Sequence, residues 1–151
     1  MPNVWPVFRI EDVATRRLDR ELLSIEASVM ERHLRRVTER LPSNSEEFRP
    51  MTDAADSVIL HLWQAIQTVI DLAVSACTHF NLGAPQNNGE AFQRLSGSGR
   101  LELDLATRLT LAAELPDLIA QDKIEMDRVY RTAQEGPADL RAFLAALETK
   151  L

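Results

Sequence analysis

The spacing of apolar residues constrains this chain more than any other feature, because they recur every three or four positions over most of its length. That period places them on one face of an α-helix. The alternating runs of valine, isoleucine and threonine that are typical of strands are missing, and the first glycine is Gly83. The sequence therefore predicts an all-α fold, an antiparallel bundle of four or five helices without a sheet.

The length of 151 residues is that of one ordinary domain. We expect a single helical domain over residues 1–151, with residues 1–9 as an amino-terminal arm. One cysteine, Cys77, excludes a disulfide framework, and the three histidines lack metal-ligand spacing, so neither a metal nor a cofactor is expected. The chain begins without a signal-peptide pattern and has no run of 18 uninterrupted apolar residues. We therefore expect a cytoplasmic protein that does not enter the membrane.

The apolar periodicity and the positions of glycine and proline predict where the helices begin and end. The expected helices are Glu11 to Leu41, Met51 to Phe80, Glu90 to Leu95, Leu101 to Ala120, Glu125 to Ala133 and Pro137 to Lys150. The second should be central, because its apolar residues cover more than one face. A kink or break is expected just before Pro116, and Gly136 should separate the last two helices.

Motifs for phosphate loops, zinc proteases and nucleophile elbows are missing from the chain. His61 is expected to bond to a neighbouring helix. Asp71 lies among apolar residues, so it should either pair with an arginine, which we favour, or lie on a polar stripe of its helix. That stripe would comprise Gln64, Gln67, Thr68 and Ser75.

Arginines at multiples of four along the first helix could form a basic ridge for phosphate contact. Arg32, Arg36 and Arg40, together with Arg108, are the candidate RNA contacts. Acidic residues interleave with them, which favours a solvated face with helical ion pairs. The net charge of −6 also argues against a general nucleic-acid coat protein, so any contact with a polyanion would be local.

Three stretches resemble the HEPN superfamily, and within it the HepT-like ribonuclease toxins that are paired with minimal nucleotidyltransferase antitoxins. They are residues 62–73 (LWQAIQTVIDLA), residues 82–95 with Pro85, Glu90-Ala91-Phe92 and Leu95, and residues 124–130 (IEMDRVY). The resemblance covers about two thirds of the chain and implies the same helical fold. It also implies a homodimer, for which the candidate interface residues are Val58, Leu62, Ile66, Leu111 and Leu115.

The resemblance also shows where this chain departs from the family pattern. An ungapped alignment through residues 124–130 puts Glu114 at the position of the arginine that holds the scissile phosphate. It puts Ile119 at the position of the acid–base histidine, and Gln121 at that of the tyrosine that the antitoxins adenylylate. Isoleucine cannot transfer a proton, and a carboxylate repels phosphate.

We therefore expect a protein that has lost the ribonuclease motif and acts as a non-catalytic binding or regulatory subunit of a toxin–antitoxin or defence-type pair. Its partner would be a nucleotidyltransferase or another defence-type protein. An active ribonuclease that uses other residues, such as Arg108, Glu114 or His61, is the first alternative. The second is a bundle that binds RNA or a nucleotide without catalysis.

Overall fold

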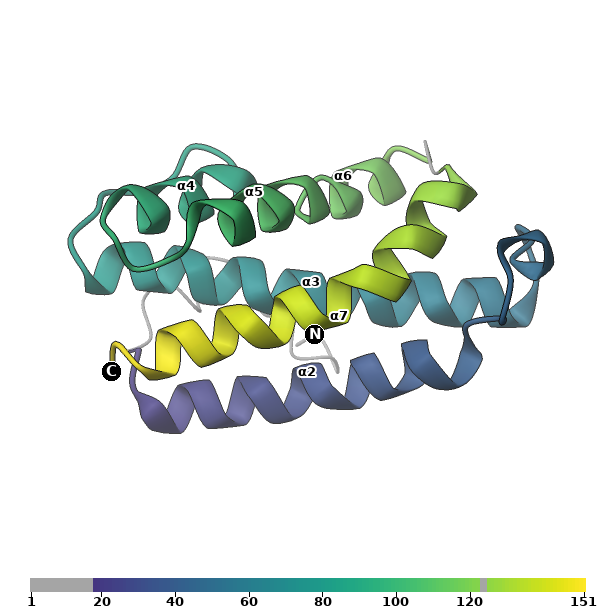
Figure 1. The fold of residues 1–151 in the computed structure, drawn as a ribbon, viewed down its shortest axis with the longest axis horizontal. Helices are drawn as coiled ribbons and strands as arrows, with labels where there is room; N and C mark the ends of the chain where they lie inside the picture. Colours follow the sequence, from purple (N-terminus) through teal and green to yellow (C-terminus); the bar gives the residue numbers. More distant parts are fainter. Residues whose placement is uncertain (1–17, 123–124) are drawn as a thin grey trace, which may run out of the picture.

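The computed structural model describes residues 18–122 and 125–151, and every regular element within them is helical (Figure 1). The expected arm at residues 1–9 lies outside the described residues. The helices are α2 (Arg20–Arg40), α3 (Asp53–His79), α4 (Asn88–Gly97), α5 (Leu103–Ala112), α6 (Leu115–Ala120) and α7 (Met126–Glu148), with a short 3₁₀ turn at Ser45–Glu47. The all-α prediction is confirmed.

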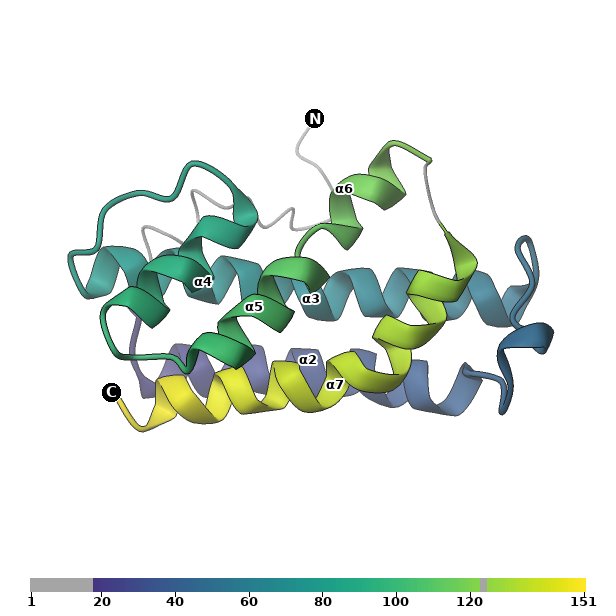
Figure 2. The ribbon, with the colours of Figure 1, turned by 45° about the horizontal axis from the view of Figure 1, so that its top comes forward.

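The long helices lie side by side and alternate in direction (Figures 1 and 2). α3 and α7 run one way, whereas α2 and the consecutive pair α5 and α6 run the other way. α4 packs against α3 and α5 at one end. If α5 and α6 are counted as one broken helix, the described residues form five helices, which agrees with the predicted antiparallel bundle.

Side-chain caps fix where several helices begin. Asp19 accepts a hydrogen bond from the backbone nitrogen of Leu22 at 2.9 Å, so α2 begins at Arg20. The expected start at Glu11 lies outside the described residues, but the helix does not run unbroken to Leu41 as predicted, because Leu18 and Asp19 are not helical and Asp19 caps α2. Thr52 caps α3 and Asn87 caps α4 in the same way.

The core lies around α3, which contacts α2, α4, α6 and α7. Its side chains are buried along most of its length, including Leu62, Ile66 and Ile70. By length and composition α3 could cross a membrane, and it is the one helix of the described residues that could. Its contacts show what the apolar surface does in the bundle: it covers the inner faces of the other helices.

Two prolines test the helix predictions. α5 ends at Ala112 and α6 begins at Leu115 with Pro116 in its first turn, so the predicted break before Pro116 is confirmed. The predicted separation at Gly136 is wrong, because α7 continues through Pro137. The helix bends along its length instead (Figures 1 and 2). Packing against α2, α3 and α5 holds both halves of α7, which offsets the backbone hydrogen bond that proline removes.

Candidate functional site

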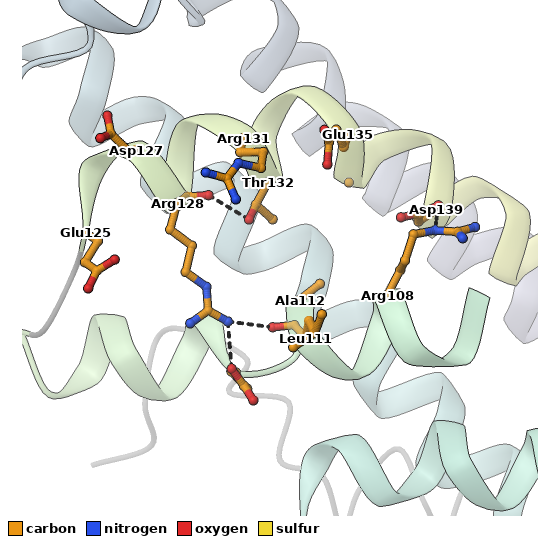
Figure 3. Close-up of a pocket in the computed structure, with 12 residues that line it drawn as sticks. Arg108, Leu111, Ala112, Glu125, Asp127, Arg128, Arg131, Thr132, Glu135 and Asp139 are labelled. Carbon is orange, nitrogen blue, oxygen red and sulfur yellow. Dashed lines mark hydrogen bonds and ion pairs between the residues drawn. The ribbon is translucent and has the colours of Figure 1, made fainter. Parts of the chain in front are cut away.

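An open pocket of about 570 Å³ lies between α7 and the break that joins α5 to α6 (Figure 3). Charged side chains dominate its walls. The lining residues are Arg108, Leu111, Ala112, Glu114, Glu125, Asp127, Arg128, Arg131, Thr132, Glu135, Gly136 and Asp139. The pocket includes Glu114, the residue that the resemblance assigns to the phosphate-binding position.

Two ion pairs cross the pocket and neutralise the charges of two arginines (Figure 3). Arg128 Nη2 lies 2.7 Å from Glu114 Oε2 and also donates to the carbonyl oxygen of Leu111 at 3.0 Å. Arg108 Nε lies 3.0 Å from Asp139 Oδ1. Each pair joins α7 to the α5–α6 segment, so two of the arginines that could hold a phosphate, Arg108 and Arg128, are already held by carboxylates.

The third arginine of the pocket, Arg131, has no ion pair within the described part of the chain. Three further carboxylates line the walls, those of Glu125, Asp127 and Glu135. The lining therefore holds five acidic residues and three arginines. Its charge balance is unfavourable for an anionic strand.

The three family positions separate in the structure. Glu114 directly precedes α6 and lines the pocket. Ile119, in α6, is half-buried and packs against the hydrophobic core, so it does not line the pocket. Gln121 ends α6 and is exposed. The structure therefore does not bring Glu114 and Ile119 together in one pocket.

The candidate interface residues fall into two groups. Val58, Leu62, Ile66 and Leu115 lie in the core of the single chain and are 0–2% exposed. Leu111 is 55% exposed at the edge of the pocket. The apolar periodicity identified inward-facing positions correctly but could not tell core from interface, and only Leu111 of the five offers surface to a partner.

The expectation for His61 is met by its partner on α2. His33 Nδ1 and His61 Nδ1 lie 2.9 Å apart, which joins α2 to α3. Neither histidine lines the pocket, and neither does His79 at the end of α3. No metal-ligating cluster of three or more side chains occurs in the described ranges 18–122 and 125–151.

Asp71 is hydrogen-bonded to Gln67, a residue of the polar stripe that was the alternative to an arginine partner. Gln67 Nε2 donates to Asp71 Oδ1 at 3.0 Å, and no arginine forms an ion pair with this carboxylate among the described residues. The favoured arginine pairing is therefore wrong for this part of the chain. Burial raises the pKa of Asp71 to about 6; the hydrogen bond from Gln67 opposes that rise and the negative charge of Glu26 adds to it.

The candidate RNA contacts lie at two separate places. Arg32, Arg36 and Arg40 are exposed on α2, where Arg36 Nη1 lies 3.4 Å from Glu39 Oε2. Arg108 is on α5 in the pocket, held by Asp139. The predicted ridge therefore does not include Arg108, and its helical ion pairing is limited to Arg36 among these three residues.

Sequence reasoning missed Arg128 as the partner of Glu114. The two residues are 14 positions apart, on either side of a helix break and a loop. The two residues lie in different helical segments, and a period along one helix cannot pair them, so only the fold could do so. The partner of His61 was missed for the same reason, because His33 lies 28 positions away on another helix.

Comparison with solved structures first identifies the class of fold. A chain of a toxin–antitoxin crystal structure with AMP-PNP superposes with a TM-score of 0.78 at 20% identity, covering 86% of this chain and 99% of that one. A tri-AMPylated HEPN toxin from Shewanella oneidensis, in complex with an MNT antitoxin, gives a TM-score of 0.77 at 21% identity, covering 87% and 99%. The bundle is thus the fold of these HEPN toxin structures.

The family follows from the sequence itself. Residues 30–147 match the family described as Ribonuclease HepT-like, so the chain belongs to that family. A search among curated proteins finds no match.

Proposed function

We propose that this chain is a HEPN-type subunit of a toxin–antitoxin pair that has lost RNA cleavage and acts by binding a nucleotidyltransferase antitoxin. One observation carries the proposal: Glu114, which the resemblance assigns to the phosphate-binding position, forms an ion pair with Arg128 at 2.7 Å. Family membership and the shared fold support the toxin–antitoxin context.

The chemistry of the pocket supports loss of cleavage. RNA cleavage needs a cation for the scissile phosphate and a group that transfers a proton near neutral pH. No histidine lines the pocket, and Ile119 packs on the core where the family pattern places its histidine. Loss of a single transition-state contact of this kind costs about 2.7–4 kcal/mol, so the loss of both leaves little catalysis.

Partner binding would use the exposed apolar surface near the pocket. Leu111 and Leu103 are 55% and 66% exposed on α5, and large exposed apolar side chains favour contact with another protein. We propose this side of α5 for the homodimer contact. The charged pocket beside it would then lie at the edge of the interface.

The first experiment measures RNA cleavage. Purified protein is incubated with transfer RNA and messenger RNA, beside a family member that has the arginine and histidine. We expect background cleavage from this chain. Cleavage gained by the double variant Glu114→Arg with Ile119→His would add support for a lost site, with a thermal melt of the variant as the check on folding.

The alternative of an active ribonuclease makes the opposite prediction. Cleavage by the wild-type chain that is lost in His61→Ala or Arg108→Ala would overturn the non-catalytic proposal. The partner half is tested separately, by whether the chain and an MNT antitoxin co-elute in size-exclusion chromatography. Separate elution at micromolar concentrations would reject that half alone.

A further inference from the structure

The His33–His61 pair lies away from the pocket, at the seam between α2 and α3. The two rings lie 5.2 Å apart between centroids and are tilted by 35°. Both side chains are half-buried, and the contact is made through Nδ1 of each ring at 2.9 Å. The Nε2 atom of each ring is not used by this contact.

The geometry fixes how protons distribute over the pair. A hydrogen bond between two Nδ1 atoms needs one proton, so one ring donates and the other accepts. In the neutral pair the accepting ring then carries its proton on Nε2, and the donating ring has a bare Nε2. One additional proton enters at that bare Nε2. The result is a cation with two Nε2–H donors and an intact bond between the helices.

The arginine ridge lies beside this pair. A spacing of four places Arg32, Arg36 and Arg40 on one side of α2. The charge of Arg32 acts on His33, and that of Arg36 acts on His61 of the neighbouring helix, so the ridge borders α3. Arg32 and Arg40 form no ion pair among the described residues, and Arg36 has the single contact with Glu39.

The nearby acidic groups leave the seam positive. Glu31 of α2 is held by Arg141 of α7, which removes it from the ridge. The pKa of His33 is lowered by burial, then by the charges of His61 and Arg32, and the pKa of His61 is lowered by burial, then by Arg36. No carboxylate contributes to either shift. A bound anion would therefore offset the charge repulsion, which together with burial opposes uptake of another proton at this seam.

We propose that the seam formed by Arg32, His33, Arg36, Arg40 and His61 binds the phosphodiester groups of a single-stranded RNA and takes up a proton as it does so. Successive arginines of the ridge lie about 6 Å apart along the helix axis, so they can follow neighbouring phosphates of an extended strand. A phosphate oxygen accepts from Nε2–H, and its charge stabilises the protonated pair. Binding at this seam requires no cleavage and is independent of the pocket.

Fluorescence anisotropy with a labelled single-stranded RNA tests the site on the full chain, between pH 5.5 and 7.5 and at two salt concentrations. We expect affinity to rise about three- to tenfold toward pH 5.5, because the protonated pair binds the anion better. Arg36→Gln should weaken binding about tenfold at every pH and reduce the salt slope by about one. His33→Gln and His61→Gln should retain binding at pH 7.5 and lose the rise.

Two control variants separate the seam from other titrating groups. His79→Gln removes the remaining histidine, and Asp71→Asn removes a carboxyl that titrates near pH 6. Both should keep the rise in affinity.

An unchanged rise in affinity toward low pH in His33→Gln and His61→Gln would overturn the proton coupling. Unchanged affinity in Arg32→Gln and Arg36→Gln, which alter exposed side chains and spare the fold, would overturn the site. Tighter binding of polyglutamate than of RNA would reject RNA as its ligand.

Discussion

Asp71 shows what burial in the bundle does to a carboxyl group. Asp71 is 7% exposed among apolar side chains of α3, and the neutral side chain of Gln67 donates a hydrogen bond to it. Burial therefore raises its pKa to about 6, above the ordinary value of 3.8. A raised pKa means that folding favours the protonated form, so the ionised form costs stability.

Asp71→Asn should stabilise the protein at alkaline pH. Above the folded pKa, the buried charge of Asp71 destabilises the wild type. As the pH falls from about 7 toward 4, the carboxyl group becomes protonated and this destabilisation disappears. Asparagine keeps an oxygen that accepts from Gln67 and never ionises. We expect a gain of about 1–2 kcal/mol at pH 8 that disappears by pH 4.

Urea unfolding at both pH values measures this difference. Glu148→Gln, which changes an exposed carboxylate near the end of α7, is the matched control and should change the unfolding free energy little. A variant Asp71→Asn that is less stable than wild type at pH 8 would show that a favourable contact of the carboxylate outweighs burial.

At the scale of single residues, the sequence could indicate a type of environment but not a partner. Asp71 stands among apolar neighbours, which predicted a compensated carboxyl, but the sequence could not decide between the arginine partner that we favoured and a place on the polar stripe. Gln67 is one helical turn away, so the correct partner was the local one. His61 was expected to reach another helix, but the register of α2 on α3 decides that His33 meets it.

The contact between helices α4 and α5 depends on one glycine, Gly89. A Cβ atom added to Gly89 would lie 2.6 Å from Thr110 Cγ2. Thr110 cannot turn away freely, because its hydroxyl donates to the carbonyl oxygen of Ala106 at 2.7 Å and accepts from Gln93 Nε2 at 2.9 Å. The helices approach this closely only because residue 89 has no side chain.

Gly89→Ala should therefore destabilise the protein by about 1–3 kcal/mol through overpacking. The same helix offers a matched control, because a Cβ at Gly97 meets nothing within 4 Å. Gly97→Ala should be neutral or should stabilise by up to about 1 kcal/mol. Thermal melts of both variants make the comparison, and equal effects at the two positions would show that helix propensity, rather than the contact with Thr110, governs α4.

Helix boundaries follow local chemistry only where packing does not override it. The break at Pro116 was predictable because α5 and α6 are short and each ends nearby. The same argument failed at Pro137, where α7 crosses α2, α3 and α5 and both halves are held. A proline signals a defect in the hydrogen-bond ladder, and tertiary contacts decide whether that defect becomes a break or a bend.

For the whole molecule, the apolar period alone was sufficient to predict the fold class, since each long helix needs a partner for its buried face. The pocket was not predictable in the same way. Its defining contact joins Glu114 to Arg128 across a break and a loop, and the alignment that singled out Glu114 carries no information about that arginine. The alignment thus singled out Glu114, and the fold shows that this residue has an ion pair of its own.

A last prediction concerns the transfer of AMP to tyrosine in a complex of this chain with an MNT antitoxin. The chain has a single tyrosine, Tyr130, which is 7% exposed and donates its hydroxyl to the carbonyl oxygen of Pro42 at 2.8 Å. The HEPN toxin from Shewanella oneidensis carries three AMP groups in its complex. In this chain the resemblance assigns the acceptor position to Gln121, which has no hydroxyl group.

Incubation with an MNT antitoxin and ATP should therefore leave the wild-type chain without AMP on tyrosine, because the Tyr130 hydroxyl is buried and bonded. Gln121→Tyr places a phenol at an exposed position at the end of α6 and should create an acceptor, whose oxygen attacks the α-phosphorus and releases pyrophosphate. Gln121→Phe has the same ring without the hydroxyl and should stay unmodified. Peptide mass spectrometry locates the adduct.

Two outcomes would contradict this prediction. AMP found on Tyr130 of the wild type would mean that the contact with Pro42 opens in the complex. An unmodified Gln121→Tyr variant that still co-elutes with the antitoxin would show that the end of α6 does not reach the partner's active site.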